Sequence, residues 1–190
     1  PRATQVDQEG VLIDNFRLVE KGSFREEATL RLLTDHPYPC RNPAQNIADL
    51  RAQVAANEKG VRELHKMVAH FGLDTVQAYM GHVQDNAEES VRRVIGTLID
   101  GAFEYEMDQG AAIKVKITVD RQARSALVDF TGTSRQAAYN LNAPLPVTRA
   151  AGLYVFRFMV DDHIPLNPGC LSPIAIRLPE VYTLAPARPP

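Results

Sequence analysis

A chain of 190 residues with 45% hydrophobic and 23% charged residues has the composition of an ordinary globular protein, and its length predicts one domain. Its formal net charge of -2 gives no electrostatic reason to expect nucleic acid or an anionic membrane as a partner. No apolar run approaches the ~18 residues that a membrane helix needs, and two distant cysteines, Cys40 and Cys170, argue against a secreted disulfide framework. We therefore expect a cytoplasmic protein without nucleic-acid or membrane partners.

The first predicted elements are a turn at Lys21 and Gly22 and a short helix from about Phe24 to Leu33. Ser23 and Glu26 have the spacing of a capping box, in which the two side chains cap the first turn of a helix. The prolines of TDHPYPC then predict a connecting loop, because each removes an amide donor and disfavours helix before it.

Two long helices are predicted next. Between Asn46 and Phe71, apolar residues recur at alternating spacings of three and four, and Asn57 occupies one position of this stripe. Gly72 predicts the end of the first helix, and Asp74 predicts the N-cap of the second, whose apolar stripe continues to about Ile99. A two-residue link between two long helices predicts an antiparallel helical hairpin.

The apolar period changes to two after Gly101, which predicts strands in residues 103–107 and 113–119 and in SALVDF. The simplest arrangement is an antiparallel β-meander with one solvated face. VTRAAGLYVFRFMV carries so little charge that, if helical, it must be buried on most sides. IAIRL is a short last strand. The predicted fold class is α+β: a long antiparallel helical hairpin, a β-meander and a buried helix.

The sequence contains histidines and cysteines, which can bind metals or act as nucleophiles, but their spacing does not match a known metal-binding or catalytic motif. His36 with Cys40, and His65 with His70, lack the three- or four-residue spacing of a helical two-ligand motif. Cys170 lies in a glycine-bearing loop, but no base is assigned to it, so a small buried thiol is the better interpretation. No phosphate-binding glycine loop, dinucleotide fingerprint or Ser-His-Asp triad stands out. We expect no metal site here and identify no catalytic residue.

Two polar groups remain as candidates for a site. In NIADLRAQVAAN, Asp49, Gln53 and Asn57 recur every four residues and so lie on one side of a helix. This polar row is either part of a functional site or simply a solvated face. The stretch DFTGTSRQAAYNLNAP, from Asp129 to Pro144, follows a strand. It is either a functional loop or only a well-formed turn, because its residue types favour turns and caps. The residue types alone leave both alternatives open.

The ordered motifs NIADLRAQVAANEKG, GLDTVQAYMGHVQDNAE, VDFTGTSRQ, NLNAP and IPLNPGCLSP resemble the hydantoinase B/oxoprolinase family, and within it the 5-oxoprolinases. The resemblance runs from about Glu9 to Pro179. It implies part of an enzyme that opens the lactam of 5-oxo-L-proline to L-glutamate at the expense of ATP, in glutathione metabolism. In this family a hydantoinase B part works together with a hydantoinase A part, ATP and a divalent metal.

By this resemblance, residues 1–190 are a single fragment of a hydantoinase B domain that continues on both sides. The family's metal-ligand stretch lies upstream, so we expect ATP and the divalent metal to bind outside this chain and the isolated chain to be inactive. A homodimer is compatible with the resemblance. The alternatives are a fragment of an N-methylhydantoinase or of an acetone carboxylase-like subunit, and a non-catalytic scaffold or assembly module that binds the hydantoinase A part.

The resemblance places nine residues in substrate-binding or positioning roles, and none of them as a nucleophile: Asp49, Gln53, Asn57, Asp129, Gly132, Thr133, Asn140, Asn142 and Asn167. These residues match the DLRAQVAAN, DFTGT, NLNAP and PLN motifs. The sequence departs from the family after Pro179, where EVYTLAP stands in place of the usual glycine-serine pair.

Overall fold

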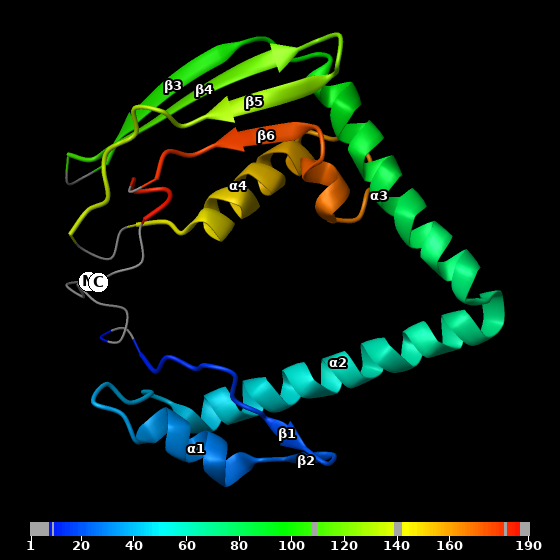
Figure 1. The fold of residues 1–190 in the computed structure, drawn as a ribbon, viewed down its shortest axis with the longest axis vertical. Helices are drawn as coiled ribbons and strands as arrows, with labels where there is room; N and C mark the ends of the chain where they lie inside the picture. Colours follow the sequence, from blue (N-terminus) through cyan, green and yellow to red (C-terminus); the bar gives the residue numbers. More distant parts are fainter. Residues whose placement is uncertain (1–7, 9, 108–109, 139–141, 181, 187–190) are drawn as a thin grey trace. The chain divides into compact units, whose positions relative to one another are not determined.

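The chain was studied as a computed structural model, which describes residues 8, 10–107, 110–138, 142–180 and 182–186. It divides into two compact units, Pro1–Val76 and Gln77–Pro190. The predicted α+β class is confirmed, with long helices and a mostly antiparallel four-stranded sheet (Figure 1). Within the described part of the chain, no helix combines the length and apolar character needed to cross a bilayer.

A small hairpin opens the first unit. Strands β1 (Val19–Glu20) and β2 (Ser23–Phe24) pair antiparallel. The turn between them consists of Lys21 and Gly22, which have φ angles of 49° and 81°. Two successive positive φ values suit the two-residue turns that connect tightly paired strands, so the predicted turn is confirmed.

Helix α1 (Glu26–Thr34) confirms the predicted short helix, but the predicted capping box is wrong. Ser23 is paired with Glu20 in the hairpin, so its side chain is not at the start of the helix. The N-cap residue is Arg25, which makes no side-chain capping hydrogen bond. The strand pairing therefore competes with the local capping pattern and prevails.

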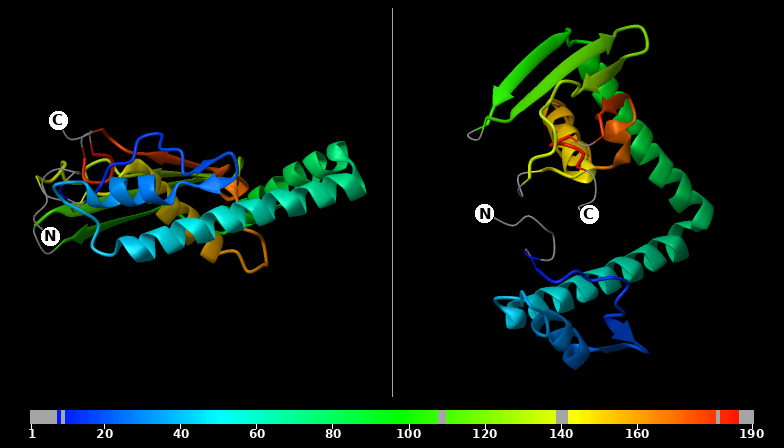
Figure 2. Two further views of the ribbon diagram at one scale, coloured as in Figure 1. Left: turned by 90° about the horizontal axis from the view of Figure 1, so that it is seen from below. Right: turned by 60° about the vertical axis from the view of Figure 1, so that its left-hand side comes forward.

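Helix α2 (Pro43–Phe71) follows the proline-bearing loop. Its N-cap is Asn42, and Gly72 ends it with a φ of 84°, the backbone conformation that glycine adopts most readily. Helix α1 lies beside the first turns of α2, and an ion pair joins Arg51 of α2 to Glu26 of α1 (Figure 2).

Helix α3 (Leu73–Ile95) confirms the second long helix. The link is Gly72 alone rather than the predicted two residues. The predicted N-cap role of Asp74 is wrong, because α3 already begins at Leu73; Asp74 lies in the first turn, where a negative charge is favourable. Because α3 begins in the first unit and continues into the second, the antiparallel packing of the two long helices stays a prediction.

The second unit is built on one sheet, in the order β3-β4-β5-β6. The predicted meander is confirmed by the antiparallel pairing of β3 (Gly101–Glu106), β4 (Ala112–Asp120) and β5 (Ser125–Asp129). Strand β6 (Ile174–Arg177) confirms the predicted last strand and pairs parallel with β5. A parallel neighbour requires a long crossover connection, which here contains α4 (Leu145–Phe158).

The core of this unit lies where the end of α3 and the inner side of α4 meet one face of the sheet (Figure 1). Val91 and Ile95 of α3 have no exposed surface, and Phe156 of α4 is 3% exposed. The sheet contributes buried Val128 and Ile174 from its two last strands.

The helix predicted in residues 147–160 is confirmed as α4, but its predicted burial on most sides is wrong. Thr148 and Phe156 are buried within α4, whereas the side chains of Tyr154 and Phe158 are 68% and 76% exposed. A single sheet can cover one side of a helix and leaves the opposite side uncovered.

Candidate functional site

The polar row of α2 consists of the predicted residues Asp49, Gln53 and Asn57, all of which are exposed. The carboxylate of Asp49 accepts a hydrogen bond of 2.7 Å from the side-chain amide of Gln45, one turn earlier. Because Asn57 is exposed, it does not need the internal hydrogen-bond partner that burial would require. This row belongs to the first unit, while the other predicted residues belong to the second.

Asp129, the last residue of β5, is held by hydrogen bonds on both carboxylate oxygens. Oδ1 accepts from the amide and the hydroxyl of Thr131, at 2.9 and 2.6 Å, and Oδ2 accepts from the guanidinium of Arg177 at 3.1 Å. The bonds from Thr131 lower the pKa of Asp129, and the positive charge of Arg177 lowers it further. Asp129 is therefore an ionised, oriented carboxylate, suited to positioning a cation or a polar group.

Gly132 and Thr133 turn the chain back onto the start of β4. Gly132 has a φ of 93°, which L-residues with a side chain seldom adopt. The Thr133 hydroxyl, in a residue 3% exposed, accepts from the amide of Lys114 and donates to the carbonyl of Lys114, both at 3.1 Å. Ser134 bonds to both main-chain groups of Ala112 at 2.8 Å. This segment thus extends the pairing of β4 through the hydroxyls of Thr133 and Ser134 and the main-chain amide of Ser134.

Asn142 forms a similar two-bond pair with the main chain. Its side-chain oxygen accepts from the amide of Ala137, and its side-chain amide donates to the carbonyl of Ala137, both at 2.9 Å. Such a pair engages both main-chain groups of Ala137 in the way that a strand neighbour would. The predicted Asn140 lies outside the described residues.

Asn167 caps the 3-10 helix η2 (Pro168–Leu171). Its side-chain oxygen accepts from the amide of Gly169 at 2.8 Å, and its side-chain amide donates to the carbonyl of Pro165 at 3.2 Å. A further bond of 3.4 Å reaches the carbonyl of Val83 on α3. Asn167 therefore joins this turn to the helix, and Cys170, with no exposed surface, is the buried thiol that the sequence predicts.

The structure brings Asp129, Gly132 and Thr133 together at the end of β5, while Asn142 and Asn167 lie in separate turns of the same unit. Two cations that the sequence did not single out border Asp129: Lys116 and Arg177 are its direct partners in the strand register. The alternating polar positions of IAIRL and of residues 113–119 were the signal that could have indicated them. The described residues contain no group of three or more His, Cys, Asp or Glu arranged to hold a metal ion.

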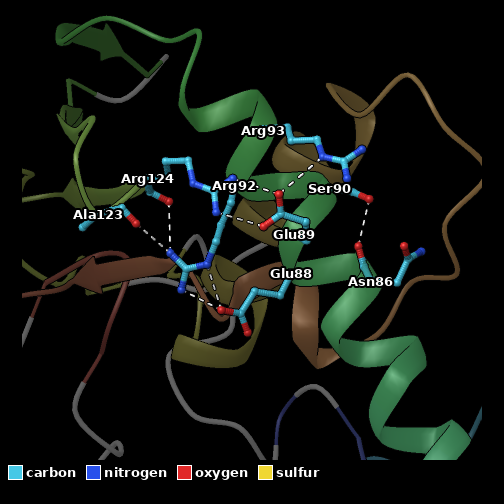
Figure 3. A network of polar contacts seen from close by, with 8 residues as sticks. All are labelled: Asn86, Glu88, Glu89, Ser90, Arg92, Arg93, Ala123 and Arg124. Carbon is cyan, nitrogen blue, oxygen red and sulfur yellow. Dashed lines mark hydrogen bonds and ion pairs between the residues drawn. The ribbon is translucent and has the colours of Figure 1, made fainter.

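A second polar cluster lies at the opposite end of β5 and joins α3 to the β4–β5 turn (Figure 3). The guanidinium of Arg92 binds Glu88 at 2.6 Å and the carbonyls of Ala123 and Arg124 at 2.9 and 3.2 Å. Arg124 in turn binds Glu89 through two bonds of 2.8 and 3.0 Å. Because these groups satisfy one another, we interpret the cluster as a structural tether.

The tether also sets the charge state of its two carboxylates. The hydroxyl of Ser172, followed by Arg92, lowers the pKa of Glu88, and Arg124 lowers the pKa of Glu89. Both carboxyl groups therefore stay ionised to a lower pH than an ordinary glutamate does. Neither has a raised pKa, which a general acid working near neutral pH would need.

Compared with models of known protein families, residues 1–190 match Hydantoinase B/oxoprolinase. The chain is 38% identical to "5-oxoprolinase" of Dictyostelium discoideum over 199 aligned residues. That alignment covers 98% of this chain, which spans 15% of the length of the relative.

Two solved structures share the fold. An ATP-dependent caprolactamase from Pseudomonas jessenii superposes with a TM-score of 0.71 at 24% identity, over 95% of this chain and 32% of the other. Nucleotide-free acetone carboxylase superposes with a TM-score of 0.70 at 15% identity, over 90% of this chain and 24% of the other. At these identities the likeness concerns the fold.

Proposed function

This chain belongs to the hydantoinase B/oxoprolinase family, and we propose that it forms part of the hydantoinase B region of an ATP-dependent 5-oxoprolinase. A region like this chain occurs in proteins named 5-oxoprolinase, ATP-dependent caprolactamase and acetone carboxylase. The observation that favours 5-oxoprolinase is the 38% identity to such an enzyme over 98% of the chain, against 24% and 15% for the other two.

The proposed reaction opens the lactam of 5-oxo-L-proline to L-glutamate. A lactam amide is a poor electrophile, so transfer of the terminal phosphoryl group of ATP to its carbonyl oxygen makes the carbonyl carbon electrophilic. Water adds to this carbon, the C–N bond breaks as the ring nitrogen takes up a proton, and hydrolysis of the resulting acyl phosphate by a second water releases L-glutamate and phosphate. ATP and a divalent metal would supply this activation, and we place both outside the described residues, together with a hydantoinase A part of the same enzyme.

In this proposal the described residues position the substrate and carry out no covalent step. Asp129 is the strongest candidate, because its carboxylate is ionised and fixed by Thr131 and Arg177. Its neighbour Arg177 is 63% exposed at the side chain, so it is accessible to an anionic group. On the first unit, Asp49 is the corresponding candidate on α2. The chain spans 15% of the length of a 5-oxoprolinase relative, so we expect it to be inactive by itself.

The test is an assay of the longer polypeptide that contains this chain, with ATP and either 5-oxo-L-proline, N-methylhydantoin or acetone. We expect L-glutamate release from 5-oxo-L-proline coupled to ATP consumption. ATP turnover without glutamate, or turnover of N-methylhydantoin or acetone in its place, would contradict the proposed substrate and favour one of the sister functions.

A scaffold or assembly role is the second candidate function. It is favoured by apolar side chains on the second half of α2 that are exposed in the structure: Val61 at 52%, Leu64 at 44%, Met67 at 46% and Phe71 at 57%. Such a surface suits contact with another chain or another part of the same enzyme.

Asn replacements distinguish the two roles. We expect Asp49→Asn or Asp129→Asn in the longer polypeptide to reduce glutamate release while its mass by light scattering stays unchanged. Asp85→Asn is the matched control, because Asp85 is 80% exposed at the side chain and pairs only weakly with His82, at 4.0 Å. A change in assembly with normal turnover per assembled enzyme would favour the scaffold.

A further inference from the structure

Helix α4 carries an apolar surface on the side that faces away from the sheet. We call it the outer face of α4 and define it by Val147, Ala151, Tyr154 and Phe158, which follow one another at steps of three and four and so share one side of a helix. Val147, Tyr154 and Phe158 are 52%, 68% and 76% exposed. The rings of Tyr154 and Phe158 stack with their centroids 6.2 Å apart.

The inner side of α4 is already fully used in packing. Phe156 is 3% exposed, and a side chain at Gly152 would lie 3.2 Å from Ile176 of β6, so helix and strand are in close contact there. The hydroxyl of Thr148 donates to the carbonyl of Leu184 at 3.1 Å. The outer face therefore contributes nothing to holding α4 on the sheet.

The charges of α4 do not suit an outer face in contact with water. The helix contains no carboxylate, and its charged residues are Arg149 and Arg157. Arg157 is held by a bond of 2.9 Å to the carbonyl of Ile164. A helix that lies at a solvent-exposed surface normally has a polar side opposite its apolar side. A helix that is apolar on both sides is typical of the interior of a larger protein.

The sheet shows the same lack of cover at β3. Phe103 and Tyr105 are register partners of Val115 and Ile113, so they lie on the apolar face against which α4 packs. Both are nevertheless exposed, at 66% and 59%. Apolar surface thus remains open on two elements of the same unit, while the core between them is closed.

We propose that the outer face of α4 is an internal surface of the intact enzyme, covered by an apolar layer from the remainder of the same polypeptide's hydantoinase B region. The proposal rests on the function proposed above. The caprolactamase chain matches 95% of this chain with only 32% of its own length, so proteins with this fold have ample further chain to provide such a layer.

The size of the surface argues against a second copy of the chain as the cover. Helix α4 has 14 residues, which makes it about 21 Å long and about 10 Å wide. Two such faces bury roughly 400 Å² together, well below the ~1,200 Å² of a stable interface. A layer from the same polypeptide loses no translational freedom on packing, so a small surface is sufficient for it.

The test places the photocrosslinking residue p-benzoylphenylalanine at position 154, and separately at 158, in the full-length polypeptide. Both replacements keep an aromatic ring, so we expect them to fold. Equal amounts of ¹⁴N- and ¹⁵N-labelled protein are mixed, irradiated and digested, and the crosslinked peptides are identified by mass spectrometry. We expect isotopically pure crosslinks to an apolar segment outside these 190 residues.

Mixed ¹⁴N–¹⁵N crosslinks would overturn the proposal in favour of a second copy. Crosslinks within the 190 residues, or no crosslinks, would overturn it because the cover would then come from this chain or be absent. The double substitution Tyr154→Glu with Phe158→Glu should also lower the Tm of the full-length polypeptide more than Ile99→Glu does. Ile99 is 74% exposed and belongs neither to the outer face of α4 nor to β3. None of these readouts requires activity, so failed lactam opening would reject the function alone.

Discussion

Gly169 of η2 lies directly against the main-chain carbonyl of Gln84 on α3, so closely that a Cβ atom at position 169 would collide with it. The contact is fixed from both sides, because Asn167 accepts a hydrogen bond from Gly169 and donates one to Val83. The motif PLNPGC is thus explained by packing: it brings the turn before β6 against α3.

Gly169→Ala should therefore destabilise the protein. The carbonyl is main chain and cannot move aside, so we expect a loss of about 1–3 kcal/mol in the free energy of unfolding, as for other overpacked sites. Gly81→Ala is the matched control: Gly81 is within α3, and a Cβ there meets nothing within 4 Å, so a gain of about 0.5–1 kcal/mol is expected. Urea unfolding measures both, and equal effects of the two substitutions would contradict this account.

Thr133→Val should cost about 1–3 kcal/mol of unfolding free energy, because both main-chain groups of Lys114 lose the hydroxyl of the buried Thr133 as their partner. Thr118→Val on the exposed side of β4 is the control and should change stability by less than about 0.5 kcal/mol. Thermal unfolding monitored by circular dichroism gives the difference. A neutral Thr133→Val would mean that water replaces the hydroxyl at the start of β4.

Arg92→Met should remove the tether between α3 and the β4–β5 turn. We expect a loss of about 1.5–3 kcal/mol, the range for hydrogen bonds to charged groups, and faster amide exchange at Ala123 and Arg124. Arg93→Met is the control, because Arg93 is 74% exposed at the side chain and meets Glu89 at 3.4 Å. An Arg92→Met variant with unchanged exchange in the turn would show that strand pairing alone holds it.

The lowered pKa of Asp129 predicts a pH dependence of stability. Its usual pKa is 3.8, and in the folded protein Thr131 and then Arg177 hold it below that value. A carboxyl group with a lowered folded pKa contributes stability above its unfolded pKa and loses it as the pH falls through the folded value. The Tm difference between wild type and Asp129→Asn should therefore be largest above about pH 5 and shrink below pH 3.8.

Scanning calorimetry at pH 2 to pH 7 tests this expectation. The wild-type Tm alone is not sufficient, because Glu88 and Glu89 also have lowered pKa values and lose stability in the same direction. A Tm difference that stays constant as the pH falls would mean that Thr131 and Arg177 stabilise the Asp129 carboxylate no more in the folded than in the unfolded chain.

The polar loop at the end of β5 shows how much of the structure the residue types alone can predict. The turn chemistry of DFTGTS could be predicted locally, since Asp, Gly, Thr and Ser favour turns and caps. The partners could not: Thr133 and Ser134 bond to β4, and Asp129 bonds to a residue of β6, 48 positions later. Most of these groups have structural partners, while a positioning role for Asp129 remains a proposal.

By itself, the sequence determined the class of the protein, both long helices, the meander, the last strand and the family, because these depend on local period, glycine stops and ordered motifs. Only the tertiary structure decided that Ser23 belongs to a hairpin and that β6 lies parallel beside β5. It also decided that α4 has one open side. The physical reason is that strand pairing and burial are set by chain segments far apart in the sequence, whose contacts no local pattern records.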